Sequence, residues 1–153
     1  MEEKKVVPGT GGDHYVPYSE RSGGESVVFF TRQLSAEGLG KIYTYVQEAL
    51  KGKIAIKLHT GEKNGPNIIP RDWVRELMDG KVSDGTIIET NSYYEGDRDT
   101  TEKHRETLRV NGWTFAPVDI MDENGAVFLL IEGGKWFTEM SVGKTLPEYD
   151  SLL

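Results

Sequence analysis

Short hydrophobic blocks of two kinds alternate along the chain. Blocks in which apolar residues run together or alternate with polar ones predict strands. These blocks lie at 27–30, 53–59, 86–89 and 115–121. Between them, apolar side chains at helical spacing and helix-start signals predict helices at 35–50, 70–80 and 100–110. The order βαβαβαβ predicts an α/β fold with a parallel or mixed sheet in three layers.

Polar and glycine residues mark the predicted helix ends. Ser35 suits the cap of the first helix and Pro70 the first residue of the second. Asp99, followed three positions later by Glu102, fits a capping box for the third helix. The predicted stops are Gly52, Gly80 and the pair Asn111–Gly112.

Beyond residue 121 the pattern changes from helices to strands. A turn at 122–125 precedes a predicted strand at 127–131, and Gly133–Gly134 suits a two-residue hairpin before a returning strand at 135–140. At the other end, residues 1–25 are rich in Gly, Pro and Ser, which predicts a flexible leader. We therefore expect one α/β domain over 26–153 that ends in a β-hairpin.

Composition narrows the classes of function. The 153 residues carry 18 Lys and Arg against 25 Asp and Glu, a net charge of -7, which disfavours binding to nucleic acid. No apolar run approaches the length of a membrane span, and the first residues lack the apolar stretch of a signal peptide. A soluble protein, either cytoplasmic or mature and exported, is expected. Without cysteine, the chain has no ligands of its own for an iron–sulfur cluster.

Polar segments follow the second, third and fourth predicted strands. In an open parallel sheet, ligands bind beyond the carboxyl ends of the strands, so a polar pocket is expected there. His59 and Glu89 directly follow or end buried strands, and His104 lies one turn into the third helix. Two imidazoles and a carboxylate suit a divalent metal such as zinc, with His59 as ligand or general base. The alternative is that both histidines are structural or solvated and that no metal binds.

An anionic ligand is the second hypothesis for the same edge. Arg98 and the free N–H groups at the start of the third helix, near Thr101, suit a carboxylate or phosphate, although Asp97 and Asp99 compete for this positive charge. Lys57 either pairs with an anion or marks an exposed strand face. The sequence contains no Walker loop, no dinucleotide-binding glycine motif, no nucleophile elbow and no His-Glu-x-x-His motif.

Three stretches together resemble the family known as domain of unknown function 362. They are 53–62 (KIAIKLHTGE) with 65–71 (GPNIIPR), 88–98 (IETNSYYEGDR) with Thr100, Thr101 and His104, and 111–113 (NGW) with 118–122 (VDIMD). Many members of this family are iron–sulfur proteins with cysteine clusters, and the cysteine-free chain departs from that pattern. The family has no settled general activity, so the resemblance implies no reaction.

The resemblance implies two further expectations. Its motifs favour one shared pocket that contains Lys57, His59, Glu89, Asn91, Tyr94, Arg98 and His104. Similar proteins continue past the motif at 149–151, where a further strand is expected, so the chain resembles the N-terminal part of a longer protein. The rival hypothesis is a non-catalytic interaction module or a fragment of an iron–sulfur-associated protein. In that case exposed Trp136 and Phe137 would mark a contact surface for self-association or for the missing C-terminal half.

Overall fold

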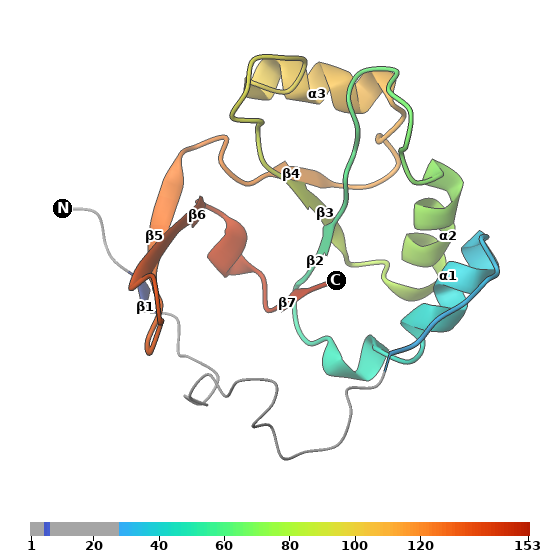
Figure 1. The fold of residues 1–153 in the computed structure, drawn as a ribbon. Helices are drawn as coiled ribbons and strands as arrows, with labels where there is room; N and C mark the ends of the chain where they lie inside the picture. Colours follow the sequence, from blue (N-terminus) through green and yellow to red (C-terminus); the bar gives the residue numbers. More distant parts are fainter. Residues whose placement is uncertain (1–4, 7–27) are drawn as a thin grey trace.

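The computed structural model describes residues 5–6 and 28–153. Its centre is a four-stranded parallel sheet in the order β4-β3-β2-β7 (Figure 1). These strands are β2 (Ile54–Lys57), β3 (Thr86–Glu89), β4 (Val118–Ile120) and β7 (Ser151–Leu152). Helices alternate with the strands, and a β-hairpin follows β4. The predicted α/β fold with a C-terminal hairpin is therefore confirmed, whereas the predicted leader at 1–25 lies outside the described residues except for 5–6.

The predicted strand at 27–30 is wrong for its described residues. Residues 28–30 have no regular secondary structure, and Val28 and Phe30 are 83% and 81% exposed. The free edge of β2 is taken by β7 instead. Lys57 N donates to Leu153 O at 2.9 Å, and Leu153 N donates to Ala55 O at 2.8 Å. These bonds satisfy β2 on that side, so no edge of β2 is left for the earlier apolar run.

Three α-helices cover the sheet, and two of them match the predicted ranges closely. They are α1 (Ala36–Tyr43), α2 (Arg71–Lys81) and α3 (Thr101–Val110). The first helix ends at Tyr43 and not near residue 50. There Thr44 Oγ1 donates to Lys41 O at 2.7 Å, and a short 3-10 helix, η2 (Gln47–Ala49), follows. Val46 and Leu50 still pack against the core, which is why the apolar spacing continues past the end of the helix.

The caps of α1 and α3 are made by side chains, with one shift from the prediction. Ser35 caps α1 as predicted and accepts a hydrogen bond from Gly38 N at 3.1 Å. Thr100, not Asp99, caps α3 by accepting from Lys103 N at 3.3 Å. Asp99 accepts instead from the backbone of its own loop, from Gly96 N at 3.2 Å.

The boundaries of α2 also differ slightly. Pro70 is the cap residue and not the first helical one, with a ψ of 122°. The helix continues through Gly80 to Lys81, and Val82 N closes it by donating to two carbonyls of the last turn. At the end of α3 the prediction is confirmed, because Asn111 is the C-cap and Gly112 has a φ of +80°.

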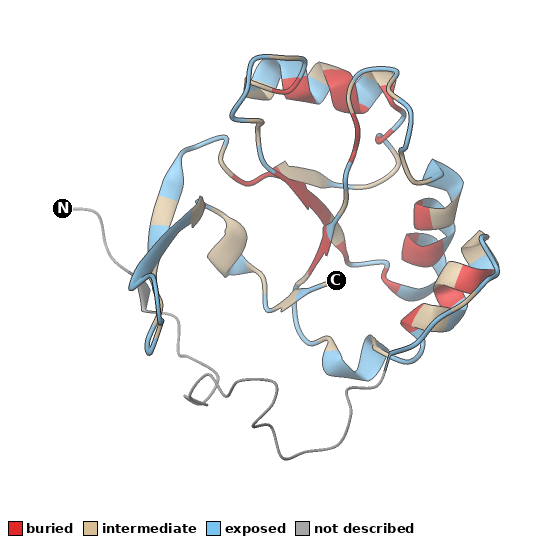
Figure 2. Ribbon diagram, viewed as in Figure 1, coloured by how far each residue is buried: buried red, intermediate tan, exposed pale blue. Residues whose placement is uncertain are grey.

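The two faces of the sheet are covered differently. Ile56, Ile87 and Ile120 form one core with buried side chains from all three α-helices. Figure 2 shows buried positions in red on the central strands and on each of these helices. The opposite face carries Ala55, Ile88 and Met121, which pack against Leu146 and Tyr149. The third layer is thus the segment with the 3-10 helix η3 (Leu146–Glu148) and not an α-helix.

The hairpin forms a second sheet with the order β1-β5-β6. Its strands are β1 (Lys5–Val6), β5 (Ala126–Leu130) and β6 (Glu139–Gly143). The strands of the hairpin are joined by residues 131–138 and not by the predicted two-residue turn, so the returning strand begins at Glu139. A Cβ on Gly134 would lie 2.0 Å from Phe137 O, because the connection folds back over this glycine. Trp136 and Phe137 are 80% and 68% exposed on this connection.

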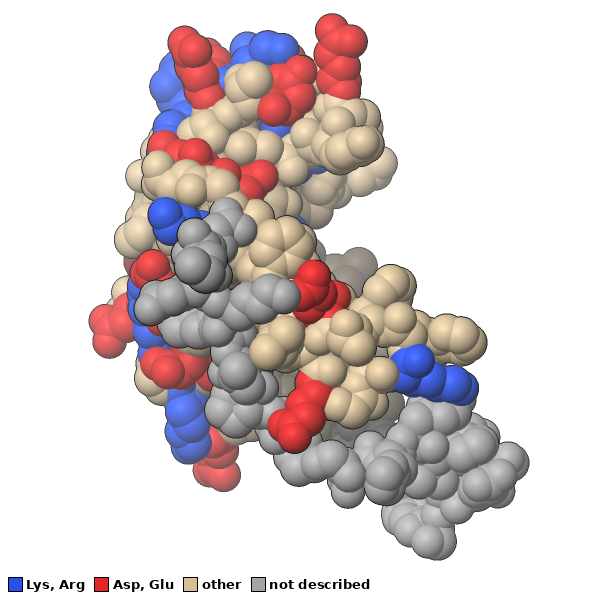
Figure 3. Space-filling model, turned by 90° about the vertical axis from the view of Figure 1, so that its left-hand side faces the viewer, with Lys and Arg blue, Asp and Glu red and all other residues tan. Residues whose placement is uncertain are grey.

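Charges of both signs are interspersed on the face shown in Figure 3, and its described residues form no large basic patch. Across residues 5–6 and 28–153, each helix is too short or too polar to cross a membrane.

Candidate functional site

A buried carboxylate lies at the carboxyl end of the central strand β3. Glu89 is only 3% exposed. Its Oε1 accepts hydrogen bonds from Thr60 N and Thr60 Oγ1, both at 3.0 Å, and its Oε2 accepts from Lys57 Nζ at 2.8 Å. Burial by itself raises the pKa of Glu89, but the hydrogen bonds from Lys57 and Thr60 outweigh burial, so the pKa lies below its usual value. The described partners of Glu89 are thus all donors, and they favour the ionised form of its carboxylate.

Arg98 joins Glu89 to a second carboxylate. Its Nη1 lies 3.6 Å from Glu89 Oε1, while its Nε donates to Glu62 Oε1 at 3.0 Å. Arg98 Nη2 and the Tyr94 hydroxyl donate to the same Glu62 oxygen, the latter at 3.1 Å. These bonds from Arg98 are the main reason that the pKa of Glu62 is lowered. Burial lowers the pKa of Arg98, but the Glu62 carboxylate outweighs it and raises that pKa above its usual value.

Exposure divides this cluster into a buried part and an accessible part. The side chains of Arg98 and Glu89 are 8% and 4% exposed, whereas that of Glu62 is 41% exposed and that of Lys57 is 48% exposed. The Arg98 guanidinium therefore contacts the buried Glu89 on one side and the partly exposed Glu62 on the other. We call these four residues with Thr60 and Tyr94 the Arg98 cluster.

His104 lies next to this cluster on the first turns of α3 and is fully buried. Its Nδ1 faces Asn91 Oδ1 at 3.3 Å, and Asn91 Nδ2 donates to Thr101 Oγ1 at 3.0 Å. With its amide oriented this way, Asn91 can only accept from the imidazole, so we assign the proton to Nδ1. Burial lowers the pKa of His104 and favours the neutral ring. Its Nε2 then carries a lone pair that has no hydrogen-bond partner in the described part of the chain.

The loop after β2 is tied to the far end of α3, which places Glu62 over Arg98. Thr60 O accepts from Trp113 Nε1 at 2.9 Å and from Asn111 Nδ2 at 3.1 Å. Asn111 Nδ2 also donates to Glu62 O at 2.9 Å. Gly61 has a φ of +85°, and a Cβ there would lie 2.4 Å from the Ile68 side chain, so the tight turn before Glu62 requires glycine.

The structure brings most of the predicted site residues together. Lys57, Glu89, Tyr94 and Arg98 belong to the Arg98 cluster, and Asn91, Thr101 and His104 form a second set beside it. His59 is exposed, and no hydrogen bond to Glu89 or His104 is formed by its side chain within residues 28–153. Sequence reasoning did not name Glu62, Thr60, Asn111 or Trp113 as site residues, although all four lie in the motifs at 53–62 and 111–113. Glu62 lies in the polar segment after β2, but nothing in its spacing marks it as the partner of Arg98.

The proposed metal set is not assembled among the described residues. In 5–6 and 28–153, no three His, Cys, Asp or Glu side chains are grouped so that they could hold an ion. Glu89 already receives donors on both oxygens, and Arg98 places a positive charge beside it. The metal site formed by His59, Glu89 and His104 stays a prediction that would need these side chains to rearrange.

Comparison with known proteins identifies no relative of this chain. No family model, no curated protein and no solved structure matches the chain. The resemblance to the domain of unknown function 362 family therefore stays a prediction carried by the motifs at 53–71, 88–104 and 111–122. The function has to be inferred from the geometry of the cluster itself.

Proposed function

We propose that the carboxyl edge of the parallel sheet binds a small anion, a carboxylate or phosphate group, with Arg98 as its anchor. One observation carries this proposal: two nitrogens of Arg98 and the Tyr94 hydroxyl converge on a single oxygen of Glu62. Convergent donors around one oxygen are what recognition of a carboxylate or phosphate requires. Glu62 occupies this position as an internal carboxylate that a ligand can replace.

The difference in exposure supports replacement of Glu62 and retention of Glu89. Glu62 is 41% exposed on a loop, so it can turn into water at small cost, and exposed ion pairs stabilise a fold only slightly. Glu89 is buried and keeps the other side of the guanidinium paired when Glu62 leaves. Lys57 is half exposed and supplies a second cation at the same edge. The cluster can therefore bind and orient an anion; no bond-breaking step follows from it.

The experiment is a titration of the full chain with inorganic phosphate and with acetate, followed by calorimetry and by NMR shifts. Wild type should bind weakly, because Glu62 competes. Glu62→Gln should bind about tenfold more tightly, since an amide is a poorer partner for Arg98 than a carboxylate. Arg98→Lys should lose most of the binding, because a lysine cannot reproduce the two parallel donors.

A matched control is Arg109→Lys, which changes a surface arginine of α3 whose ion-pair partner among residues 28–153 is Glu106. Its anion affinity should equal that of wild type. Thermal unfolding of each variant checks that the fold is kept. Equal binding by wild type, Glu62→Gln and Arg98→Lys would show that Arg98 is not the anchor and would overturn the proposal.

A further inference from the structure

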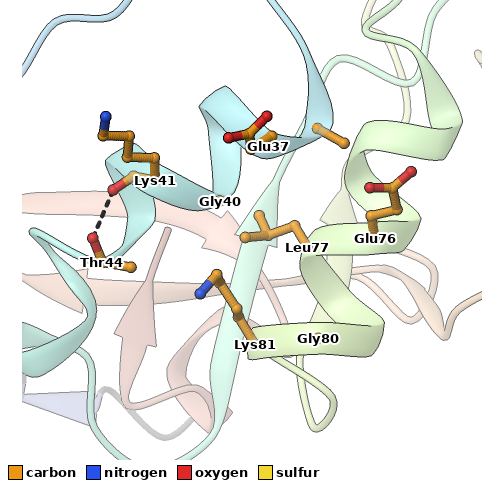
Figure 4. Close-up of a pocket in the computed structure, with 9 residues that line it drawn as sticks. Glu37, Gly40, Lys41, Thr44, Glu76, Leu77, Gly80 and Lys81 are labelled. Carbon is orange, nitrogen blue, oxygen red and sulfur yellow. Dashed lines mark hydrogen bonds between the residues drawn. The ribbon is translucent and has the colours of Figure 1, made fainter.

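A cavity of about 500 Å³ lies between α1 and α2 and shares no residue with the Arg98 cluster. Leu77 of α2 lies at its centre, and Gly40 and Gly80 face it from the two helices (Figure 4). Ligand cavities for small molecules commonly measure roughly 300–1,000 Å³, so this volume is in the range of a binding site. The remaining lining residues are Ala36, Glu37, Lys41, Thr44, Glu76 and Lys81.

The two glycines keep the cavity open, and packing does not explain Gly80. A glycine inside a helix costs about 1 kcal/mol relative to alanine. A Cβ built on Gly80 would meet no atom within 4 Å, so alanine would fit there. At Gly40 a Cβ would approach Lys81 Cε at 3.3 Å, a contact that a flexible side chain can relieve. Both helices thus lack a side chain where they face the same space.

The charges around the cavity are separated by sign. Figure 4 shows Glu37 and Glu76 on one side, Lys41 and Lys81 on the other, and Leu77 between them. Glu37 and Lys41 are four residues apart on one helix, a spacing at which opposite charges normally pair. Glu37 instead accepts a hydrogen bond from Gln33 Nε2 at 2.8 Å.

Unlike Glu37, the other three charged side chains of the cavity have no such partner in the described part of the chain. Among residues 28–153, no ion pair or side-chain hydrogen bond is formed by the Lys41 ammonium, the Glu76 carboxylate or the Lys81 ammonium. Two cations and an anion around one cavity therefore keep their charge available to a bound molecule.

We propose that this cavity binds a small linear zwitterion, a molecule with an ammonium at one end, a carboxylate at the other and an apolar middle. The carboxylates of Glu37 and Glu76 would receive the ammonium, and Lys41 and Lys81 would receive the carboxylate. The apolar middle would lie over Leu77 and fill the open space beside Gly80, next to the Lys81 stem that lies against Gly40. This inference is independent of the anion site at Arg98.

The test uses 6-aminohexanoate as the probe, with hexanoate and hexylamine as matched controls that each lack one charge. Binding to the full chain is measured by calorimetry and by NMR shifts of the Gly40 and Gly80 amides. We expect 6-aminohexanoate to shift both glycine amides and to bind at least about tenfold more tightly than either control, because each control loses one charged contact. Equal binding of all three probes, or shifts confined to residues outside the cavity, would overturn the proposal.

Variants separate the cavity from the fold. Glu76→Gln should weaken binding of 6-aminohexanoate but affect hexanoate less, because hexanoate has no ammonium. Lys81→Gln should weaken binding of 6-aminohexanoate but affect hexylamine less, because hexylamine has no carboxylate. Gly80→Ala should keep the fold and raise its melting temperature, since alanine favours the helix. Gly80→Leu should fill the space and abolish binding while the protein stays folded. If Gly80→Leu is folded and binds 6-aminohexanoate as wild type does, the molecule does not occupy this cavity.

Discussion

Replacing Glu89 by glutamine tests most directly whether the buried negative charge of the Arg98 cluster stabilises the fold. The change keeps the size of the side chain but removes a buried charge. All described neighbours of the Glu89 carboxylate contact it with donors: Thr60 N, Thr60 Oγ1, Lys57 Nζ and Arg98 Nη1. The amide nitrogen of glutamine is itself a donor, so one side of the new side chain must face a donor, and Arg98 loses its buried counter-charge.

The magnitude follows from the burial of each partner. Removing one member of a buried ion pair costs about 3–5 kcal/mol. Lys57 is 48% exposed and can replace its lost partner with water, which places the cost near the lower end. We therefore expect Glu89→Gln to lower the free energy of unfolding by about 3 kcal/mol out of a typical total of 5–15 kcal/mol.

Urea unfolding at pH 7, followed by circular dichroism, measures this loss. With a denaturant slope of about 2 kcal/mol per molar, the midpoint should fall by about 1.5 M urea. The control is Glu106→Gln, which removes a surface carboxylate paired with Arg109 and should leave the midpoint almost unchanged. A midpoint for Glu89→Gln within about 0.3 M of wild type would refute the reasoning, because the buried carboxylate would then contribute nothing.

The same variant predicts a pH dependence with a fixed sign. The pKa of Glu89 is lowered in the folded protein from an ordinary value of 4.5. Its contribution to stability is therefore complete above about pH 4.5 and is lost as the pH falls through the lower folded pKa. The difference in unfolding free energy between wild type and Glu89→Gln should shrink in acid. A constant difference from pH 7 down to strongly acidic pH would contradict the lowered pKa.

Three further predictions concern single side chains. Because burial lowers the pKa of His104 below 6.5, wild type should lose stability as the pH falls from 7 to 5, and His104→Gln should lose less in urea titrations at each pH. Tyr149→Phe removes a 2.9 Å hydrogen bond to Asp119 and should cost about 1 kcal/mol by urea unfolding, whereas an unchanged midpoint would mean that water replaces it. Ser35→Ala removes the α1 cap and should also cost about 1 kcal/mol, with Ser35→Thr retaining most of the stability.

Local signals predicted the elements whose partners are close in sequence. The strand at 86–89 and the cap at Ser35 match the structure, because apolar runs and cap hydrogen bonds depend on a few neighbouring residues. The strand expected at 27–30 is not formed at its described residues, 28–30, because a strand needs a partner from elsewhere, and β7 supplies that partner to β2. The hairpin turn fails for a related reason: Gly133–Gly134 resembles a two-residue turn, but the first ladder pair beyond the connection is Leu130 with Glu139.

In the candidate site, too, the sequence predicted part of the residue set and missed the partners that depend on long-range contacts. The rule that ligands lie at the carboxyl ends of parallel strands led from the sequence to Lys57, Glu89 and Arg98, and these three side chains do meet. The rule cannot distinguish which neighbouring loop residue completes the set. His59 ends up exposed, whereas Glu62, three positions later, pairs with Arg98.

The sequence by itself determined the α/β order of the chain, most helix starts, and the edge of the sheet where polar residues gather. These properties follow from periodicity and from short-range hydrogen bonds, both of which depend on residues close together in the sequence. Only the tertiary structure decided that β7 borders β2, that Glu62 covers Arg98, and that His104 Nε2 meets no hydrogen-bond partner from the described residues. Each of these depends on segments far apart in the chain, because burial and long-range pairing are properties of the folded whole and not of any one stretch.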